Sequence, residues 1–501
     1  MAAPAKVTVQ PSRHVYDVIV LGGQLAGAVA AALLARQGHR VLLVEHDGLG
    51  PGYEHGGYLL PYAPFVTPSM KSMPVMDEVL TELGLNTAAS RALRAHVPEL
   101  QLVLPEYRFD LPANETRRAA ELARAVGDPQ RAKAIGAAIS ALAAFHEQSD
   151  PFFRDPALEL PPDGMMETWG LKSLIKRHPL LSADVPGHGD EPALRLLHRM
   201  APFLTYQAEP QHPLARARAL SQTLAGPERY PGGREGLRDL LNKKLQDLGG
   251  DLLSREGGEN FIAEQIAFDG DKVVGVKLLQ SDMIYRAQAL VAATDSDAIR
   301  RLITEKKKHR KLSESLEWSS TKQFLFTVNW VIKETGLPRG MGELVLHATS
   351  DDLDPILIQQ HAARRAGGGK EEEGLKVLTA GVFVPGSTRD LGEPYLAELS
   401  ERIGAHLDAL MPFSRQHVVL VSAPYLHAGG LRGSRLLPHP LFQIEADALL
   451  GVEGLNQRTP VKNLFLANRE VLPGLGLEGE LLAGRRAARL VQGLTKKRPG
   501  L

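Results

Sequence analysis

Residues 16–45 constrain the fold of this chain more than any other segment. The run YDVIVL at 16–21 has the apolar, β-branched character of a buried parallel strand. GGQLAG at 22–27 then forms a tight glycine turn, AVAAALLARQG at 28–38 continues as a helix, and RVLLV at 40–44 makes a second strand. This order of strand, turn, helix and strand predicts a βαβ unit.

The turn and the acid that follows it predict a dinucleotide site. Glycines let a backbone approach a pyrophosphate, whose charge is stabilised at the N-terminus of the next helix. Glu45 lies 23 residues after Gly22, at the spacing where an acid binds ribose hydroxyls. The motif departs from GxGxxG at one position, because Gln24 stands where the second glycine is expected. A βαβ unit that binds no nucleotide is the alternative.

An uncharged run overlaps this unit. Residues 18–35 (VIVLGGQLAGAVAAALLA) form 18 positions without a charge, close to the length of a membrane span. Gly22, Gly23 and Gln24 in the middle of the run disfavour one continuous helix. The run therefore predicts a strand, a turn and a helix of a soluble protein, and a signal peptide or membrane span is the alternative.

The composition excludes several classes of chemistry. The chain has no cysteine, which excludes disulfides, thiolate catalysis, iron–sulfur clusters, cysteine-bound zinc and a flavin attached through sulfur. Its 58 Lys and Arg residues balance 58 Asp and Glu residues, which argues against nucleic acid as the main partner. The 17 histidines show no metal-binding spacing, so we expect no metal site. The absence of cysteine fits a reducing compartment, and we expect a cytoplasmic location.

An apolar segment interrupted by prolines spans residues 58–76. Within it Met70, Met73 and Met76 have helix-like spacing. These side chains either pack in the core or form an adaptable apolar wall for a lipophilic ligand, because methionine fits irregular surfaces.

Helices are predicted over 114–147, with a break near 127–129, and over most of 165–224. This helical region either shapes a substrate pocket or has a structural role alone. An amphipathic helix is predicted over 394–411.

Short strands are predicted in the second half of the chain, at 261–268, 272–278, 287–292, 323–331 and 375–384. We assign the last two to a second sheet. Between them, residues 364–374 (RRAGGGKEEEG) are expected to form a flexible surface loop. Two basic clusters, 305–311 and 495–501, are predicted to be solvated helix ends, with attraction to an anionic membrane surface as the alternative.

A second strand, turn and helix lies near the end of the chain. NLFLA at 463–467 predicts a strand, PGLGLEG at 473–479 a glycine turn, and ELLAGRRAARL at 480–490 a helix. Amides at the start of that helix are suited to an electron-rich ring edge or a developing negative charge.

With these segments the sequence resembles the FAD-dependent phytoene desaturase-like group within the amine oxidase and Rab-GDI-like superfamily. The resemblance is carried, in the expected order, by YDVIVLGGQLAG…VLLVE at 16–45, YPGGREGL…LGG at 230–250, VVGVKL…ALVAATDSDAI at 273–299 and NLFLA…PGLGLEGELLAGRRAA at 463–488. It implies an α/β fold with a Rossmann-like FAD-binding domain of the GR2 type and a discontinuous α+β substrate domain. The implied bounds are 14–90, 226–303 and 455–495 for the FAD domain, and 91–225 and 304–454 for the substrate domain.

The resemblance also implies which residues bind FAD. They are Gly22, Gly23, Gln24, Leu25, Ala26 and Gly27 at the pyrophosphate, Glu45 at the ribose, Ile262 and Ala263 at the adenine, Ala293 and Thr294 along the dinucleotide, Asn468 and Arg469 after the late strand, and Gly476, Leu477 and Glu478 at the flavin ring.

This chain departs from the group's pattern in three places. Gln24 replaces the middle glycine, and the GGR stretch that usually follows the ribose acid is reduced to Gly56 and Gly57. The late strand usually ends in Gly-Asp or Gly-Glu, where this chain has Asn468 and Arg469. Under the resemblance, Arg469 would contact a phosphate, and Glu470 would supply the acid one residue late.

A bound flavin would accept or give a hydride, and such a site needs positioning and exclusion of water more than a protein acid or base. We therefore assign no catalytic residue. The first hypothesis is an FAD-dependent oxidoreductase that desaturates, saturates or isomerises a lipophilic, carotenoid-like or isoprenoid-like substrate, with contact to a membrane surface. The second is a non-catalytic lipid-binding or prenyl-binding protein. The third is amine oxidation, which needs an aromatic cage from residues such as Trp330 or Tyr425.

Overall fold

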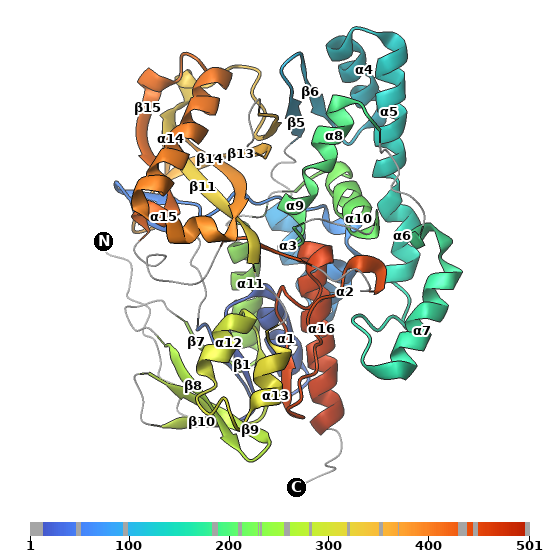
Figure 1. The fold of residues 1–501 in the computed structure, drawn as a ribbon, viewed down its shortest axis with the longest axis vertical. Coiled ribbons are helices and arrows are strands. Elements are labelled where there is room, and N and C mark those ends of the chain that lie inside the picture. The colour runs from blue at the N-terminus through green and yellow to red at the C-terminus, as the bar shows by residue number, and fades with distance from the viewer. Residues whose placement is uncertain are drawn as a thin grey trace.

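The structure is a computed structural model that combines two sheets with a region of helices (Figure 1). It describes residues 14–46, 52–93, 99–182, 189–208, 213–228, 230, 233–254, 261–279, 283–317, 321–349, 354–368, 370–428, 438–443 and 449–495. Pro231 and Gly232 of the YPGG run, which carries part of the resemblance, and the basic tail beyond residue 495 lie outside the described residues.

The first sheet contains the predicted βαβ unit. Its strands, in order across the sheet, are β7 (Asp251–Leu253), β2 (Val41–Val44), β1 (Val15–Leu21), β10 (Ile284–Ala292), β9 (Lys272–Leu278) and β8 (Ala263–Asp269), and β17 (Leu464–Leu466) also pairs with β10. The pairs from β7 through β2 and β1 to β10, and from β10 to β17, are parallel, whereas β9 and β8 run antiparallel. The ends of β1, β2, β10 and β17 therefore meet at one edge, which we call the carboxyl edge.

Helix α1 (Leu25–Arg36) accounts for most of the uncharged run at residues 18–35. Every residue from Leu25 to Ala35 is buried, because α1 packs between the first sheet and two other helices, α11 (Gly233–Asp247) and α16 (Gly476–Thr495). A helix that is apolar on all sides belongs in such a core. The search for membrane spans, over the part of the chain that the structure describes, found no helix both long and apolar enough.

The second sheet is mostly antiparallel and lies beside the first. Its strands run in the order β15 (Val418–Ser422), β11 (Thr321–Lys333), β14 (Glu371–Pro385), β13 (Ile356–Arg365), β12 (Leu344–His347), β5 (Leu100–Val103) and β6 (Arg108–Leu111), with β16 (Pro440–Phe442) on β11 and the hairpin of β3 (Tyr53–His55) and β4 (Tyr58–Leu60) on β13. Because β3 and β4 lie in this sheet, the range 14–90 contributes to both sheets. The proposed domain bounds stay a prediction.

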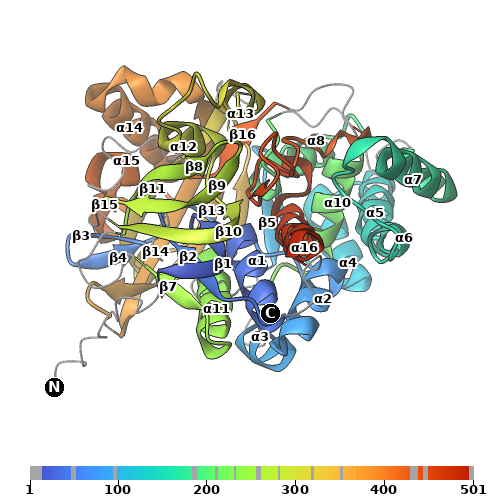
Figure 2. The ribbon, with the colours of Figure 1, turned by 90° about the horizontal axis from the view of Figure 1, so that it is seen from below.

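Helices complete the structure, as Figures 1 and 2 show. Their bounds are α2 (Pro74–Leu83), α3 (Asn86–Leu93), α4 (Glu115–Val126), α5 (Pro129–Ala143), α6 (Phe145–Phe153), α7 (Gly164–Arg177), α8 (Pro192–His198), α9 (Ala201–Leu204), α10 (Pro213–Leu224), α12 (Ser296–Leu302), α13 (Arg310–Ser315), α14 (Glu393–Leu410) and α15 (Pro424–His427). Helices α4 to α10 form the helical region at the right of Figure 1, with α7 at its outer side. The expected break falls at Gly127, which ends α4 with a left-handed φ of 76°.

Two sequence expectations change in the structure. The stretch 364–374 is not a loop over its whole length. Strand β13 extends to Arg365 and β14 begins at Glu371, so the two strands form a hairpin. Cross-strand ion pairs support it: Arg364 contacts Glu371, and Arg365 contacts Glu372. Met73 and Met76 are buried in the main core, which favours packing over a ligand wall.

Candidate functional site

The carboxyl edge of the first sheet brings together residues that the sequence separates widely. Gly22 follows β1, Glu45 follows β2, and Ala293 follows β10, while Asn468 and Arg469 lie two and three residues beyond β17. In open α/β sheets, ligands bind outside the carboxyl ends of the strands. A dinucleotide is therefore expected to bind at this edge.

Two glycines of the first turn are required by the backbone itself. Gly22 has a φ of +124°, and a Cβ there would lie 2.2 Å from the carbonyl oxygen of Ala293. A Cβ on Gly27 would lie 2.4 Å from the Cβ of Ala293. Both glycines let the turn and α1 pack against the end of β10, so the motif is needed whether or not a ligand binds.

The middle position of the motif is filled by a network of side chains. Gln24 Nε2 donates to Asp295 Oδ1 at 2.7 Å, and Gln24 Oε1 accepts from the amide of Arg469 at 3.0 Å. The Arg469 guanidinium donates two hydrogen bonds to Asp295, at 2.9 and 2.6 Å. We call these three residues the clasp. It spans the position at which the second glycine of GxGxxG would admit a pyrophosphate.

Glu470 and Asn468 connect the segment that follows β17 to the segment that follows β10. Glu470 accepts from the amide of Ser296 at 2.6 Å and from its hydroxyl at 2.9 Å. Asn468 Nδ2 donates to the Thr294 carbonyl at 2.8 Å. Burial, with the Asp295 charge nearby, raises the pKa of Glu470 to about 8. The acid predicted to lie near the ligand is thus bonded to the start of α12.

The acid expected at the ribose is also bonded to protein. Asn242 Nδ2 donates to Glu45 at 2.8 Å, and the Arg238 guanidinium lies 3.5 Å from the same oxygen. Next to it, His46 Nδ1 accepts from the amide of Ala263, on the strand expected to pass the adenine. Burial lowers the pKa of His46 to about 4, so the ring is neutral and able to accept.

The late turn joins the helical region to the first sheet. Gly476 has a φ of +53°, and a Cβ there would lie 2.0 Å from the Leu204 carbonyl oxygen. Glu478 accepts two hydrogen bonds from Arg218, each at 2.9 Å, and both side chains are fully buried. Glu480 contacts Arg234, and it accepts from Tyr206 at 2.6 Å. The carboxylates at the start of α16 are therefore held by arginines of the chain.

Burial tests whether FAD fits these residues. Leu25, Ala26, Thr294 and Asn468 are 0% exposed, and Glu478 is 1% exposed, although no ligand covers them. Side chains that line a dinucleotide groove would be accessible to water without the ligand. The groups at the turn and the late strand are therefore covered by protein in this conformation, which does not fit a bound FAD diphosphate, and we derive no chemical step through a flavin.

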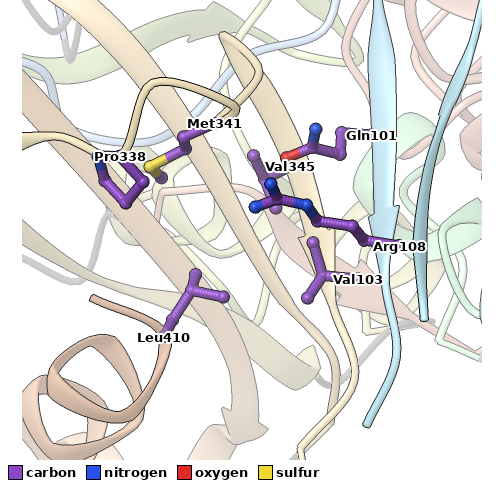
Figure 3. Close-up of a pocket in the computed structure, with 7 residues that line it drawn as sticks. All are labelled: Gln101, Val103, Arg108, Pro338, Met341, Val345 and Leu410. Atoms are coloured by element: carbon purple, nitrogen blue, oxygen red, sulfur yellow. The ribbon is translucent and has the colours of Figure 1, made fainter. Parts of the chain in front are cut away.

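A pocket among the described residues lies elsewhere. Figure 3 shows it between the edge of the second sheet and the end of α14, with Arg108 directed toward Met341 and Leu410. Its volume is about 20 Å³, enough for one or two water molecules. It is therefore too small for an organic ligand.

The aromatic cage needed for amine oxidation does not form from the two candidate residues. Trp330 and Tyr425 both belong to the core cluster that packs under α14, where Tyr425 lies 5.1 Å from Phe324, ring to ring. The next residue along β11, Asn329, points to the opposite face of the strand. There it donates to Tyr53 and Pro61 and accepts from Thr379, so this buried polar face has its own partners.

Sequence reasoning did not identify the partners of the predicted site residues. Asp295 stood in the quoted run AATDSDAI without a role, and its partner Arg469 is 174 positions away. Arg218 and Glu478 are 260 positions apart. Charged residues directly after apolar strands were the available signal, but that signal does not say which charges pair.

Comparisons with known proteins identify the fold. The family model for an NAD(P)-binding Rossmann-like domain matches residues 20–83. A search of curated proteins found no match. Among solved structures, an oxidoreductase from Methanosarcina mazei is 14% identical with a TM-score of 0.54, over 94% of this chain and 100% of its own. Cyclohexylamine oxidase from Brevibacterium oxydans is 17% identical with a TM-score of 0.52, over 96% and 100%. A redesigned putrescine oxidase is 15% identical with a TM-score of 0.55, over 96% and 99%.

The chain has the same fold as these oxidoreductases and amine oxidases. The predicted α/β, Rossmann-like fold class is thereby confirmed. At 14–17% identity the likeness establishes the fold alone. The phytoene desaturase-like subgroup and the carotenoid-like substrate stay predictions, and two of the three structures named above are amine oxidases.

Proposed function

We propose that this chain is a non-catalytic binding protein built on a flavin-type oxidoreductase fold. The observation that supports the proposal is the clasp of Gln24, Asp295 and Arg469, which lies where the glycine motif predicts a pyrophosphate. The glycines that the backbone needs are present, while the position that would admit the ligand is filled.

Opening this site for FAD would be costly. The Gln24 side chain would have to leave, and Arg469 would have to release Asp295 or keep a carboxylate beside the incoming phosphates. Breaking a buried ion pair by removing one partner costs about 3–5 kcal/mol. A ligand must recover that free energy before it binds measurably.

The ligand class that we propose is a lipid or prenyl compound, as the superfamily resemblance implies. The pocket in Figure 3 is too small to hold such a chain. The proposal of a non-catalytic role rests on the clasp and does not depend on the identity of this ligand.

FAD uptake by the purified full chain tests the proposal. We expect a colourless protein that does not quench the fluorescence of added FAD. The matched variant Gln24→Gly/Asn468→Gly/Arg469→Asp restores the group's pattern at the clasp, and we expect it to bind FAD at least tenfold more tightly than the wild type, about 1.4 kcal/mol. Wild-type protein that retains flavin absorption through desalting would overturn the proposal.

An FAD-dependent oxidoreductase acting on a lipophilic substrate is the second candidate. Gly22, Gly27 and Glu45 support it, as does the similarity to solved oxidases. Under this candidate the clasp opens when FAD binds, and the wild type takes up one FAD per chain. The same uptake experiment therefore decides between the two functions.

A further inference from the structure

Helix α7 packs against the rest of the protein by one side only. Leu171 and Leu174 are buried in the main core, and Glu167 accepts a hydrogen bond from Arg486 at 2.6 Å. Figure 1 shows α7 at the outer side of the helical region, away from both sheets. Its opposite side is therefore free to meet another surface.

That outer side carries large apolar side chains. Met165, Met166 and Trp169 are 70%, 86% and 66% exposed, although such residues are usually buried. They lie within one turn of the helix, so they form a continuous apolar tip. A tip of this composition points to an apolar environment that covers it.

Basic residues continue the same side of the helix. Residues three and four positions apart are neighbours on a helix, which places Lys172 and Lys176 in line with Met165 and Trp169. Both lysines are exposed, and neither has an ion-pair partner within the described ranges. The acidic residue of the helix, Glu167, is turned inward to Arg486. The outer side is thus apolar at its start and positive along its length.

We propose that α7 docks on a bilayer that carries anionic headgroups. Met165, Met166 and Trp169 enter the boundary between headgroups and acyl chains, where tryptophan is favoured, while Lys172 and Lys176 contact the phosphates. We choose a lipid surface as the occupant because it offers apolar depth and a uniform negative charge to the same helix face. The inference concerns a surface remote from the clasp and does not depend on whether FAD binds.

Vesicle binding by the full chain tests the docking surface. We expect the wild type to sediment with phosphatidylcholine vesicles that contain phosphatidylglycerol, and much less with pure phosphatidylcholine. Met165→Ser/Met166→Ser/Trp169→Ser should weaken binding at least about tenfold. Lys172→Gln/Lys176→Gln should weaken it and reduce its dependence on salt. Phe413→Ser changes another highly exposed apolar residue, 82% exposed, and should leave binding unchanged.

Tryptophan fluorescence supplies an independent readout. In a Trp318→Phe variant, the emission of Trp169 should shift to shorter wavelength when the anionic vesicles are added, whereas Trp330 is buried and should not respond. The proposal is overturned if folded wild type does not bind these vesicles, or if the apolar triple variant binds as well as the wild type. A dimer that the triple variant abolishes, without vesicle binding, would overturn it in favour of a second copy of the chain.

Discussion

Two sets of residues meet at the carboxyl edge of the first sheet, and they contribute differently. Gly22 and Gly27 allow the turn and α1 to pack against the backbone and the side chain of Ala293. Gln24, Asp295 and Arg469 bond to one another and close the space that those glycines border. The difference shows that a glycine turn after a strand is first a requirement of the fold. Ligand binding depends on the residues between the glycines and on those facing them.

The largest effect should come from the packing set. Gly22→Ala places a Cβ against the Ala293 carbonyl at a left-handed φ, and we expect a loss of about 3 kcal/mol or more in the free energy of unfolding. Urea denaturation measures the change. Gly170→Ala is the control, because a Cβ on this exposed helical glycine meets nothing within 4 Å. It should stabilise the chain by about 0.5–1 kcal/mol. If the two substitutions change the free energy of unfolding equally, Gly22 is not required for packing against Ala293.

The clasp should be the next most sensitive set. Arg469→Met leaves the Asp295 carboxylate without its main partner, and we expect a loss of about 3 kcal/mol in the free energy of unfolding. Arg310→Met breaks an exposed helical pair with Glu314 and should cost less than about 0.5 kcal/mol. If Arg469→Met costs no more than this control, the clasp does not stabilise the edge.

The smallest effect concerns the residue behind the clasp. Since the folded pKa of Glu470 is raised to about 8, its folded form holds a proton that the unfolded chain releases. Stability from this group is therefore present at low pH and lost as pH rises between about 5 and 8. Glu470→Gln keeps a neutral side chain, so the stability of the variant relative to wild type should increase as pH rises through that range. Parallel stability curves for variant and wild type would show that Glu470 is ionised in the fold.

Local patterns predicted most of the first sheet. Alternation of apolar strands with glycine turns located β1, β2, β10 and β17, because these strands are buried on both faces and bounded by breakers. The second sheet was harder. Residues 356–365 include charged and polar side chains that pair across strands, and such pairing is invisible until the neighbour is known.

The sequence predicted that the candidate site residues lie at one edge of the sheet, but it did not predict which side chains they contact. The positions of Gly22, Gln24, Glu45 and Arg469 at one edge follow from strand order in a parallel sheet. Their partners do not, because each partner comes from a distant segment, as Asn242 does for Glu45. The sequence showed that Gln24 was unusual, and only the packing showed what its side chain contacts.

The contacts of Arg218 have a consequence for how the protein unfolds. Its guanidinium reaches Ser149 and Asp150 on α6 and Glu478 on α16, and it lies 4.0 Å from the centre of the Phe153 ring. One side chain thus links the helices on the right of Figure 1 to the last helix of the dinucleotide-type fold. We therefore expect these parts to unfold as a single cooperative unit, with amides that exchange with solvent together, at the rate of global opening.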